Sequence, residues 1–159
     1  MELYPGNEDL SAPPGTVRVA RRINAGPEHV WRIIGTAEGM AQWLGAAVFQ
    51  PRIDGRVLLD TSGATRDDRI VVVGRVLEYE PPGELRFSWR QLYEDFSSWP
   101  AYTELRLTVT AQPGGSRIEL SHSGLERLGQ FSEQAYRVYH HCWVETRYLE
   151  RLEPGDGKR

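Results

Sequence analysis

Cysteine and lysine are almost absent from this chain of 159 residues. Cys142 is the only cysteine, so an intramolecular disulfide is excluded, and the composition fits a reducing compartment. Lys158 is the only lysine, so nearly all of the 19 basic residues are arginines. They are scattered along the sequence and the net charge is only −3, so we expect no concentrated basic face of the kind that binds nucleic acids.

Long apolar runs are missing as well. No stretch approaches the roughly 18 apolar residues that a membrane-spanning helix needs, and the first residues do not form a signal-peptide pattern. We therefore expect a cytoplasmic protein without a membrane span. The length favours a single domain that buries about 70% of the surface of its unfolded chain.

Several patterns that are typical of catalytic or metal sites are also absent. The four histidines and the single cysteine do not have the spacing of zinc ligands. His140 and His141 are adjacent on a predicted helix, where they point in different directions and cannot share one metal. The sequence has no G-x-S-x-G element and no glycine-rich phosphate loop. We therefore expect no metal and no cofactor.

The clearest positive signal is a strand-turn-strand pattern, GRVLEYEPPGELRFSW. In its second half Leu85, Phe87 and Trp89 alternate with polar residues, so a period of two places them on one face of a strand. The Pro-Pro-Gly sequence at residues 81–83 ends the first strand and turns the chain. The pattern predicts one hairpin of a curved sheet, and such sheets often enclose a pocket.

Strand patterns recur at short intervals along the rest of the chain. The first strand precedes two short helices, of which one begins at Pro27 and the other covers residues 36–43. The chain closes with its longest amphipathic pattern, residues 131–152, which has apolar residues at spacings of three and four. The predicted strands are residues 16–23, 46–49, 56–61, 70–79, 85–90, 102–111 and 116–123.

The fold class follows from this order of elements. Seven mostly antiparallel strands can bury one face only if another element covers it, and the C-terminal helix alone is long enough. We therefore predict an α+β helix-grip (START-like) fold, in which a curved sheet wraps around that helix. One domain covers residues 16–152, and residues 1–15 and 153–159 form flexible tails.

Six motifs, taken in order, resemble the heat-shock-protein ATPase activator homologue family of the START-like, or polyketide cyclase (SRPBCC), superfamily. They are INAGPEHVW, QWLG, DGRV, GRVLEYEPPGELRFSW, IELSHSGL and CW. The resemblance covers residues 16–152 and implies a helix-grip fold. It departs from the family at residues 54–57, which read Asp-Gly-Arg-Val where the family has Gly-Gly-aromatic, and at Cys142, where a smaller residue is usual.

The candidate site is a hydrophobic cavity between the sheet and the C-terminal helix, occupied by a small hydrophobic or aromatic molecule. Tryptophan offers flat apolar surface with one N–H group, which suits such a ligand, although core packing explains these residues about as well. A homodimer and a lid or partner role for residues 91–101 stay open. The residues expected to bind the ligand are Trp43, Phe87, Trp89, Leu105, Leu120, His122, Val138 and Cys142.

His122 is the one candidate catalytic residue. It shares its strand parity with Ile118 and Leu120, so we expect it to point inward, where a structural role is favoured over ligand contact or proton transfer. Three functions are then open. The preferred one is ligand binding with no demonstrated chemistry. A cyclase- or aromatase-like enzyme using His122 is the alternative, and the family name implies a third, stimulation of a heat-shock ATPase.

Overall fold

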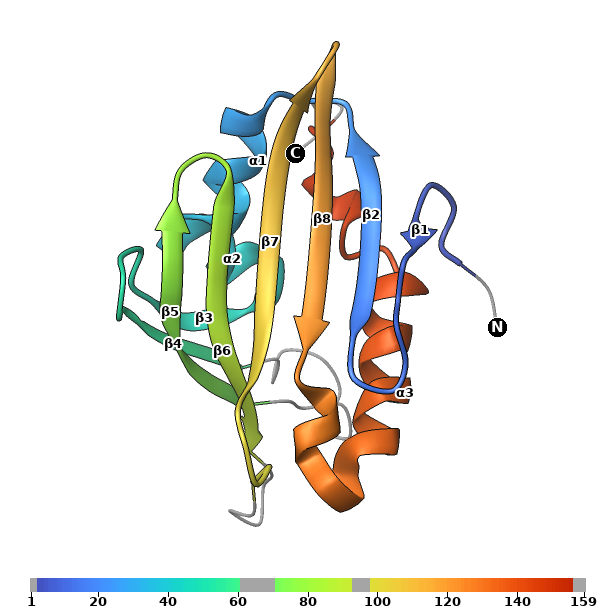
Figure 1. Ribbon diagram of the computed structural model, residues 1–159. Helices are drawn as coiled ribbons and strands as arrows, with labels where there is room; N and C mark the ends of the chain where they lie inside the picture. Colours follow the sequence, from blue (N-terminus) through green and yellow to red (C-terminus); the bar gives the residue numbers. More distant parts are fainter. Residues whose placement is uncertain (1–2, 61–70, 93–97, 156–159) are drawn as a thin grey trace.

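The computed structural model describes residues 3–60, 71–92 and 98–155. These residues form one antiparallel sheet in the strand order β1-β2-β8-β7-β6-β5-β4-β3, which Figure 1 shows face on with the helices behind it. The strands are β1 (Glu8–Asp9), β2 (Val17–Ile23), β3 (Ala46–Phe49), β4 (Arg56–Asp60), β5 (Val71–Glu80), β6 (Glu84–Leu92), β7 (Thr103–Gln112) and β8 (Gly115–Ser123). The helices are α1 (Pro27–Ile34), α2 (Ala37–Leu44) and α3 (Ser132–Val144), with 3-10 turns at η2 (Leu125–Phe131) and η3 (Glu150–Leu152).

The helix-grip fold predicted from the sequence is confirmed, with one correction to the number of strands. All seven predicted strands are present, but the sheet has an eighth, β1, which lies in the segment expected to be a flexible tail. Glu8 pairs with Ala20 and Asp9 with Val19, so the described part of this segment adds an edge strand beside β2. The main chain also donates from Tyr4 to the carbonyl of Val144, 3.2 Å away.

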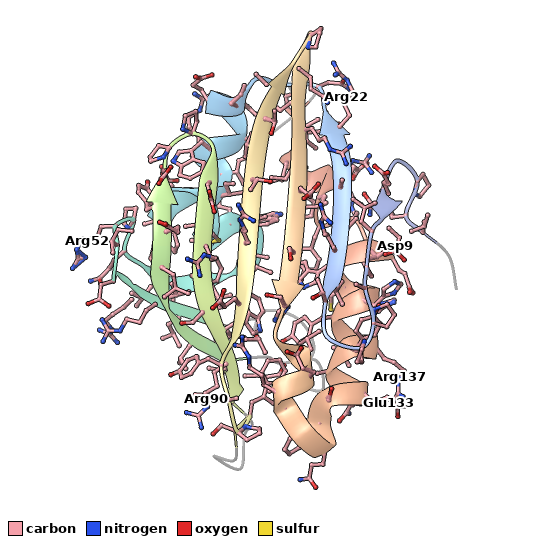
Figure 2. The ribbon with its side chains drawn as sticks, viewed as in Figure 1. Asp9, Arg22, Arg52, Arg90, Glu133 and Arg137 are labelled. Atoms are coloured by element: carbon pink, nitrogen blue, oxygen red, sulfur yellow. The ribbon has the colours of Figure 1, made fainter. Side chains whose placement is uncertain are left out.

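A histidine of α3 also holds the N-terminal segment. Nε2 of His140 lies 2.8 Å from the carboxylate of Asp9, and its Nδ1 lies 2.8 Å from that of Glu145. Burial raises the pKa of Asp9, but hydrogen bonds from Ser11 and His140 outweigh it, so the pKa lies below its ordinary value. Figure 2 shows Asp9 beside α3, on the opposite side of the molecule from β3.

The predicted hairpin is formed by β5 and β6. Leu85, Phe87 and Trp89 all point into the core and are almost fully buried, as the alternation predicts. On the neighbouring strand β7, Leu105 lies opposite Phe87 and Thr103 opposite Trp89. The hairpin therefore supplies the centre of the sheet's inner face.

Two short helices connect β2 to β3. Pro27 occupies the first turn of α1, where its missing N–H group costs nothing. The hydroxyl of Thr36 caps α2 by accepting a hydrogen bond from the main-chain N–H of Gly39 at 3.0 Å. Gly45 ends α2 in the left-handed conformation with φ of 72°, which glycine adopts without strain. This turn sets the position of the last two residues of α2, Trp43 and Leu44.

The C-terminal helix is shorter than the sequence pattern predicts. The pattern indicated one helix over residues 131–152, whereas α3 ends at Val144 and only the short turn η3 follows. The hydroxyl of Thr146 donates to the carbonyl of Cys142, a local bond of the kind that bends and ends helices. Residues 145–149 therefore leave the helix axis, which gives Tyr148 a position that a continuous helix would not allow.

The buried face of α3 differs in part from the predicted apolar stripe, which ran through Ala135 and Val138. Ala135, Tyr139 and Trp143 face the sheet and are at most 5% exposed, whereas Val138 is 39% exposed. Figure 2 shows Glu133 and Arg137 on the outward side of the same helix. The aromatic residues Tyr139 and Trp143 thus form the inner stripe of the helix.

Arginines on the outer face of the sheet pair with glutamates of neighbouring strands. Arg18 lies 2.8 Å from Glu119, and Arg106 lies 2.8 Å from Glu84. Figure 2 shows side chains that end in nitrogen or oxygen atoms on this face of the sheet. Such exposed pairs each contribute at most about 1 kcal/mol, so they set the surface charge pattern more than the stability.

Candidate functional site

An apolar cavity lies between α3 and the inner face of the sheet, and we call it the inner cavity. Its volume is about 40 Å³. A buried water needs about 10–15 Å³ on the same kind of measure, so the space is a few waters in size. Strands β4, β5 and β6 contribute one wall, α3 the opposite wall, and the end of α2 and residue 148 the rim. The lining residues are Leu44, Leu59, Val72, Trp89, Tyr139, Cys142, Trp143 and Tyr148.

Behind this cavity lies a hydrogen-bonded group that we call the His122 network. Nε1 of Trp143 donates to Nδ1 of His122 at 3.2 Å. The hydroxyl of Thr103 lies 2.8 Å from Nε2 of His122 and donates to the carbonyl of Trp89 at 2.9 Å. The chain of bonds therefore ties α3 to strands β6, β7 and β8.

These bonds determine the protonation of His122. The indole nitrogen of Trp143 can only donate, so Nδ1 of His122 accepts and its proton sits on Nε2, which donates to Thr103. Complete burial lowers the pKa of His122 to about 3. The imidazole is therefore neutral, and both ring nitrogens are occupied. This arrangement favours the structural role over proton transfer.

Aromatic rings form most of the cavity wall. The rings of Trp89 and Tyr139 are perpendicular with centroids 5.7 Å apart, and Trp143 lies edge-on to Trp89 at the same distance. Nε1 of Trp89 donates to the hydroxyl of Tyr139 at 3.1 Å, and that hydroxyl donates to the side chain of Gln91 at 2.6 Å. Because these polar atoms bond to one another, the rings present apolar surface to the cavity.

Cys142 lies on the α3 wall of the cavity, and Tyr148 lies at its rim. Burial raises the pKa of the Cys142 thiol to about 11, so the sulfur is a neutral, apolar group at physiological pH. Burial and the nearby Cys142 likewise raise the pKa of Tyr148. The Tyr148 ring is half-buried and contacts the edge of Trp143 with centroids 5.5 Å apart. Its main-chain carbonyl accepts a hydrogen bond from Nε1 of Trp43 at 2.8 Å.

A larger groove lies on the outside of this rim, and we call it the outer groove. Its volume is about 610 Å³, and it is bounded by α1, α2 and the chain that follows α3. Its surface is largely polar, with both acidic and basic side chains. The lining residues are His29, Ile33, Gln42, Trp43, Arg147, Glu150, Arg151, Glu153, Pro154 and Gly155.

The residues expected to bind a ligand fall into five groups in the structure. Trp89 and Cys142 line the inner cavity, and Trp43 lines the outer groove. His122 belongs to the network behind the cavity. Val138 faces a separate cavity of about 60 Å³ beside Trp99 and Phe131. The remaining three, Phe87, Leu105 and Leu120, are fully buried in the core, where other side chains cover them.

Sequence reasoning missed the other residues of the inner cavity. Tyr139 and Trp143 are four residues apart, a spacing that places them on one helix face, and this signal was available. Tyr148 carries no such signal, because its position depends on the end of α3. In the aromatic segment 91–101, Trp99 is buried against the ring of Tyr139, with centroids 5.7 Å apart, whereas residues 93–97 lie outside the described residues.

In residues 3–60, 71–92 and 98–155, no group of three or more His, Cys, Asp or Glu side chains could hold a metal ion. No helix in that part of the chain has the length and apolar character needed to cross a bilayer.

Known proteins share both the sequence pattern and the fold. The family model described as "Activator of Hsp90 ATPase homolog 1-like protein" matches residues 24–153. A search of curated proteins finds no match. Among solved structures, MLL2253 from Mesorhizobium loti is 24% identical with a TM-score of 0.69, covering 86% of this chain and 93% of that one.

Two further solved structures are similar to the chain. CalU16 from Micromonospora echinospora is 21% identical with a TM-score of 0.61, over 96% of this chain and 86% of that one. DynU16, a protein of the dynemicin biosynthetic locus, is 20% identical with a TM-score of 0.65, over 88% of this chain and 46% of that one. At such identities the likeness shows a common fold.

Proposed function

The chain belongs to the Activator of Hsp90 ATPase homolog 1-like family, and on that basis we propose that it binds a small apolar or aromatic molecule in the inner cavity. The observation that carries the proposal is the composition of the cavity wall. Four aromatic rings, one of them the movable Tyr148 ring, and the neutral thiol of Cys142 surround the space. A ligand there gains from burial of apolar surface, at about 25 cal/mol per Å².

The inner cavity is too small to take a ligand unless one of its side chains moves. Pockets for drug-sized ligands usually have volumes of about 300–1,000 Å³, far above the space observed here. The ligand must therefore displace a side chain, and Tyr148 is the best candidate. Its ring is half-buried, and its hydroxyl makes no hydrogen bond to a described residue. The ring can rotate outward while Trp43 still holds the main-chain carbonyl of Tyr148.

Catalysis is not part of the proposal. A cyclase-like reaction needs a group that moves a proton, and the neutral His122 has both nitrogens engaged with Trp143 and Thr103. ATPase stimulation, which the family name suggests, requires a protein-binding surface, whereas the inner cavity suits a small molecule.

A titration with fluorobenzene followed by ¹⁹F NMR tests the proposal. We expect saturable binding to the wild-type protein and loss of at least tenfold in affinity in Cys142→Leu, because the larger side chain fills the inner cavity. Val138→Leu is the matched control, since it adds bulk on the same helix but faces the other cavity. The proposal would be contradicted if fluorobenzene did not bind the wild-type protein, or if Cys142→Leu bound it with unchanged affinity.

A further inference from the structure

A thin partition separates the inner cavity from the outer groove. Leu44 and Tyr148 line the inner cavity, whereas their chain neighbours Trp43 and Arg147 line the outer groove. The same two chain segments, the end of α2 and the residues after α3, therefore face both spaces. One hydrogen bond, from Nε1 of Trp43 to the carbonyl of Tyr148, joins the two segments at this point.

The charged side chains of the outer groove differ in whether they have a partner. Glu150 lies 3.4 Å from Nε of Arg147, and the carboxylate of Glu153 accepts a hydrogen bond from the main-chain N–H of Asn24 at 2.9 Å. Arg151, in contrast, makes no ion pair with any described residue. The groove thus holds one guanidinium that an anion could pair with.

His29 adds a second polar group without a partner. It lines the outer groove from α1, and its Nε2 atom is buried with no hydrogen-bond partner among the described residues. A buried polar atom without a partner is destabilising, and a ligand group that pairs with it would remove that cost.

Arg151 also connects the groove to the rim of the inner cavity. Its guanidinium lies over the ring of Tyr148, 5.5 Å from the centroid. A cation over an aromatic face is attracted to the ring, so this contact helps to hold the Tyr148 ring in place. An anion that draws Arg151 into the groove weakens this contact and frees the ring that must move for a ligand to enter.

From these contacts we propose that the natural ligand is amphipathic, with an apolar body in the inner cavity and a carboxylate in the outer groove paired with Arg151. This inference rests on the proposed binding function and names the class of ligand. A singly charged carboxylate fits better than a dianion, because Glu150 and Glu153 also face the groove. The groove is then the entrance to the inner cavity, across the Trp43–Tyr148 partition.

Two probes that differ only in charge test this inference, 4-fluorophenylacetate and 4-fluorophenylacetamide, each titrated by ¹⁹F NMR. We expect the wild-type protein to bind the carboxylate about three- to fivefold more tightly than the amide, as for other exposed charge pairs. The preference should disappear in Arg151→Gln and in 1 M salt. Arg137→Gln is the control, since this arginine lies on the outward side of α3.

The outcomes separate the two proposals. If the wild type binds both probes equally, or if Arg151→Gln keeps the preference, the carboxylate site is wrong while binding in the inner cavity stands. If neither of these probes nor fluorobenzene binds, both proposals are wrong. Loss of the preference in Arg137→Gln as well would also contradict a specific role for Arg151.

Discussion

The His122 network and the rim of the inner cavity lie on the same interface between α3 and the sheet, yet they are built differently. In the network the polar atoms of His122, Thr103 and Trp143 are all hydrogen-bonded and fully enclosed. At the rim, the Tyr148 ring is held by its contact with Trp143 and by the guanidinium of Arg151. From this difference we infer that the network anchors α3, so that the rim can move without unfolding the helix.

Deleting a hydroxyl group from the network should have the largest effect. Thr103→Val leaves Nε2–H of His122 without its acceptor in a dry site, which should cost about 1–3 kcal/mol in the free energy of unfolding. Urea denaturation measures the loss. Thr110→Val, the same change at an exposed position of the same strand, should cost less than about 0.5 kcal/mol. Equal losses in the two variants would mean that the network does not anchor α3.

Acidification should weaken the network over a defined range. In the folded state His122 has a pKa of about 3, so it is protonated only near that pH. In the unfolded chain its pKa is about 6.5. Below pH 6.5 the unfolded state binds the extra proton, so stability falls by about 1.4 kcal/mol per pH unit, or about 2 kcal/mol between pH 6.5 and 5.

Substitution of the histidine isolates this effect. Urea denaturation at several pH values should show a shallower slope for His122→Gln than for the wild type. Thr110→Val, which changes no titratable group at an exposed position of β7, should keep the wild-type slope. A slope that is the same in all three proteins would argue against a buried neutral His122.

Deleting a hydroxyl group from the rim should have the smallest effect. Tyr148→Phe removes a group that makes no hydrogen bond to a described residue, so we expect a change below about 0.5 kcal/mol. Thermal denaturation is sufficient to compare it with the wild type. A loss as large as that of Thr103→Val would erase the distinction between rim and network.

The sheet was largely predictable from the sequence. Its strands alternate apolar and polar residues, and the period of two identifies the inward face without knowledge of tertiary contacts, as for Leu85 and Phe87. β1 was missed because it has only two residues, both acidic and exposed, and it pairs through its main chain. Such a strand leaves no mark on hydrophobic periodicity.

The site was less predictable, for two physical reasons. Strand parity shows which residues point inward but not how deeply they are covered, so Phe87 and Leu105 were assigned to a cavity wall although the core encloses them. The other reason is α3, whose buried stripe of Tyr139 and Trp143 was passed over for a stripe through Val138. Its early end, which places Tyr148 at the rim, depends on the hydrogen bond of Thr146.

The most direct test is a crystal of the ligand-free protein soaked in bromobenzene, with the bromine located by its anomalous signal. We expect bromine in the inner cavity, in contact with the rings of Trp89, Tyr139 and Trp143, and the Tyr148 ring rotated outward while His122 and Thr103 keep their positions. Bromine only on the surface or in the outer groove, with Tyr148 unmoved, would contradict binding in the inner cavity.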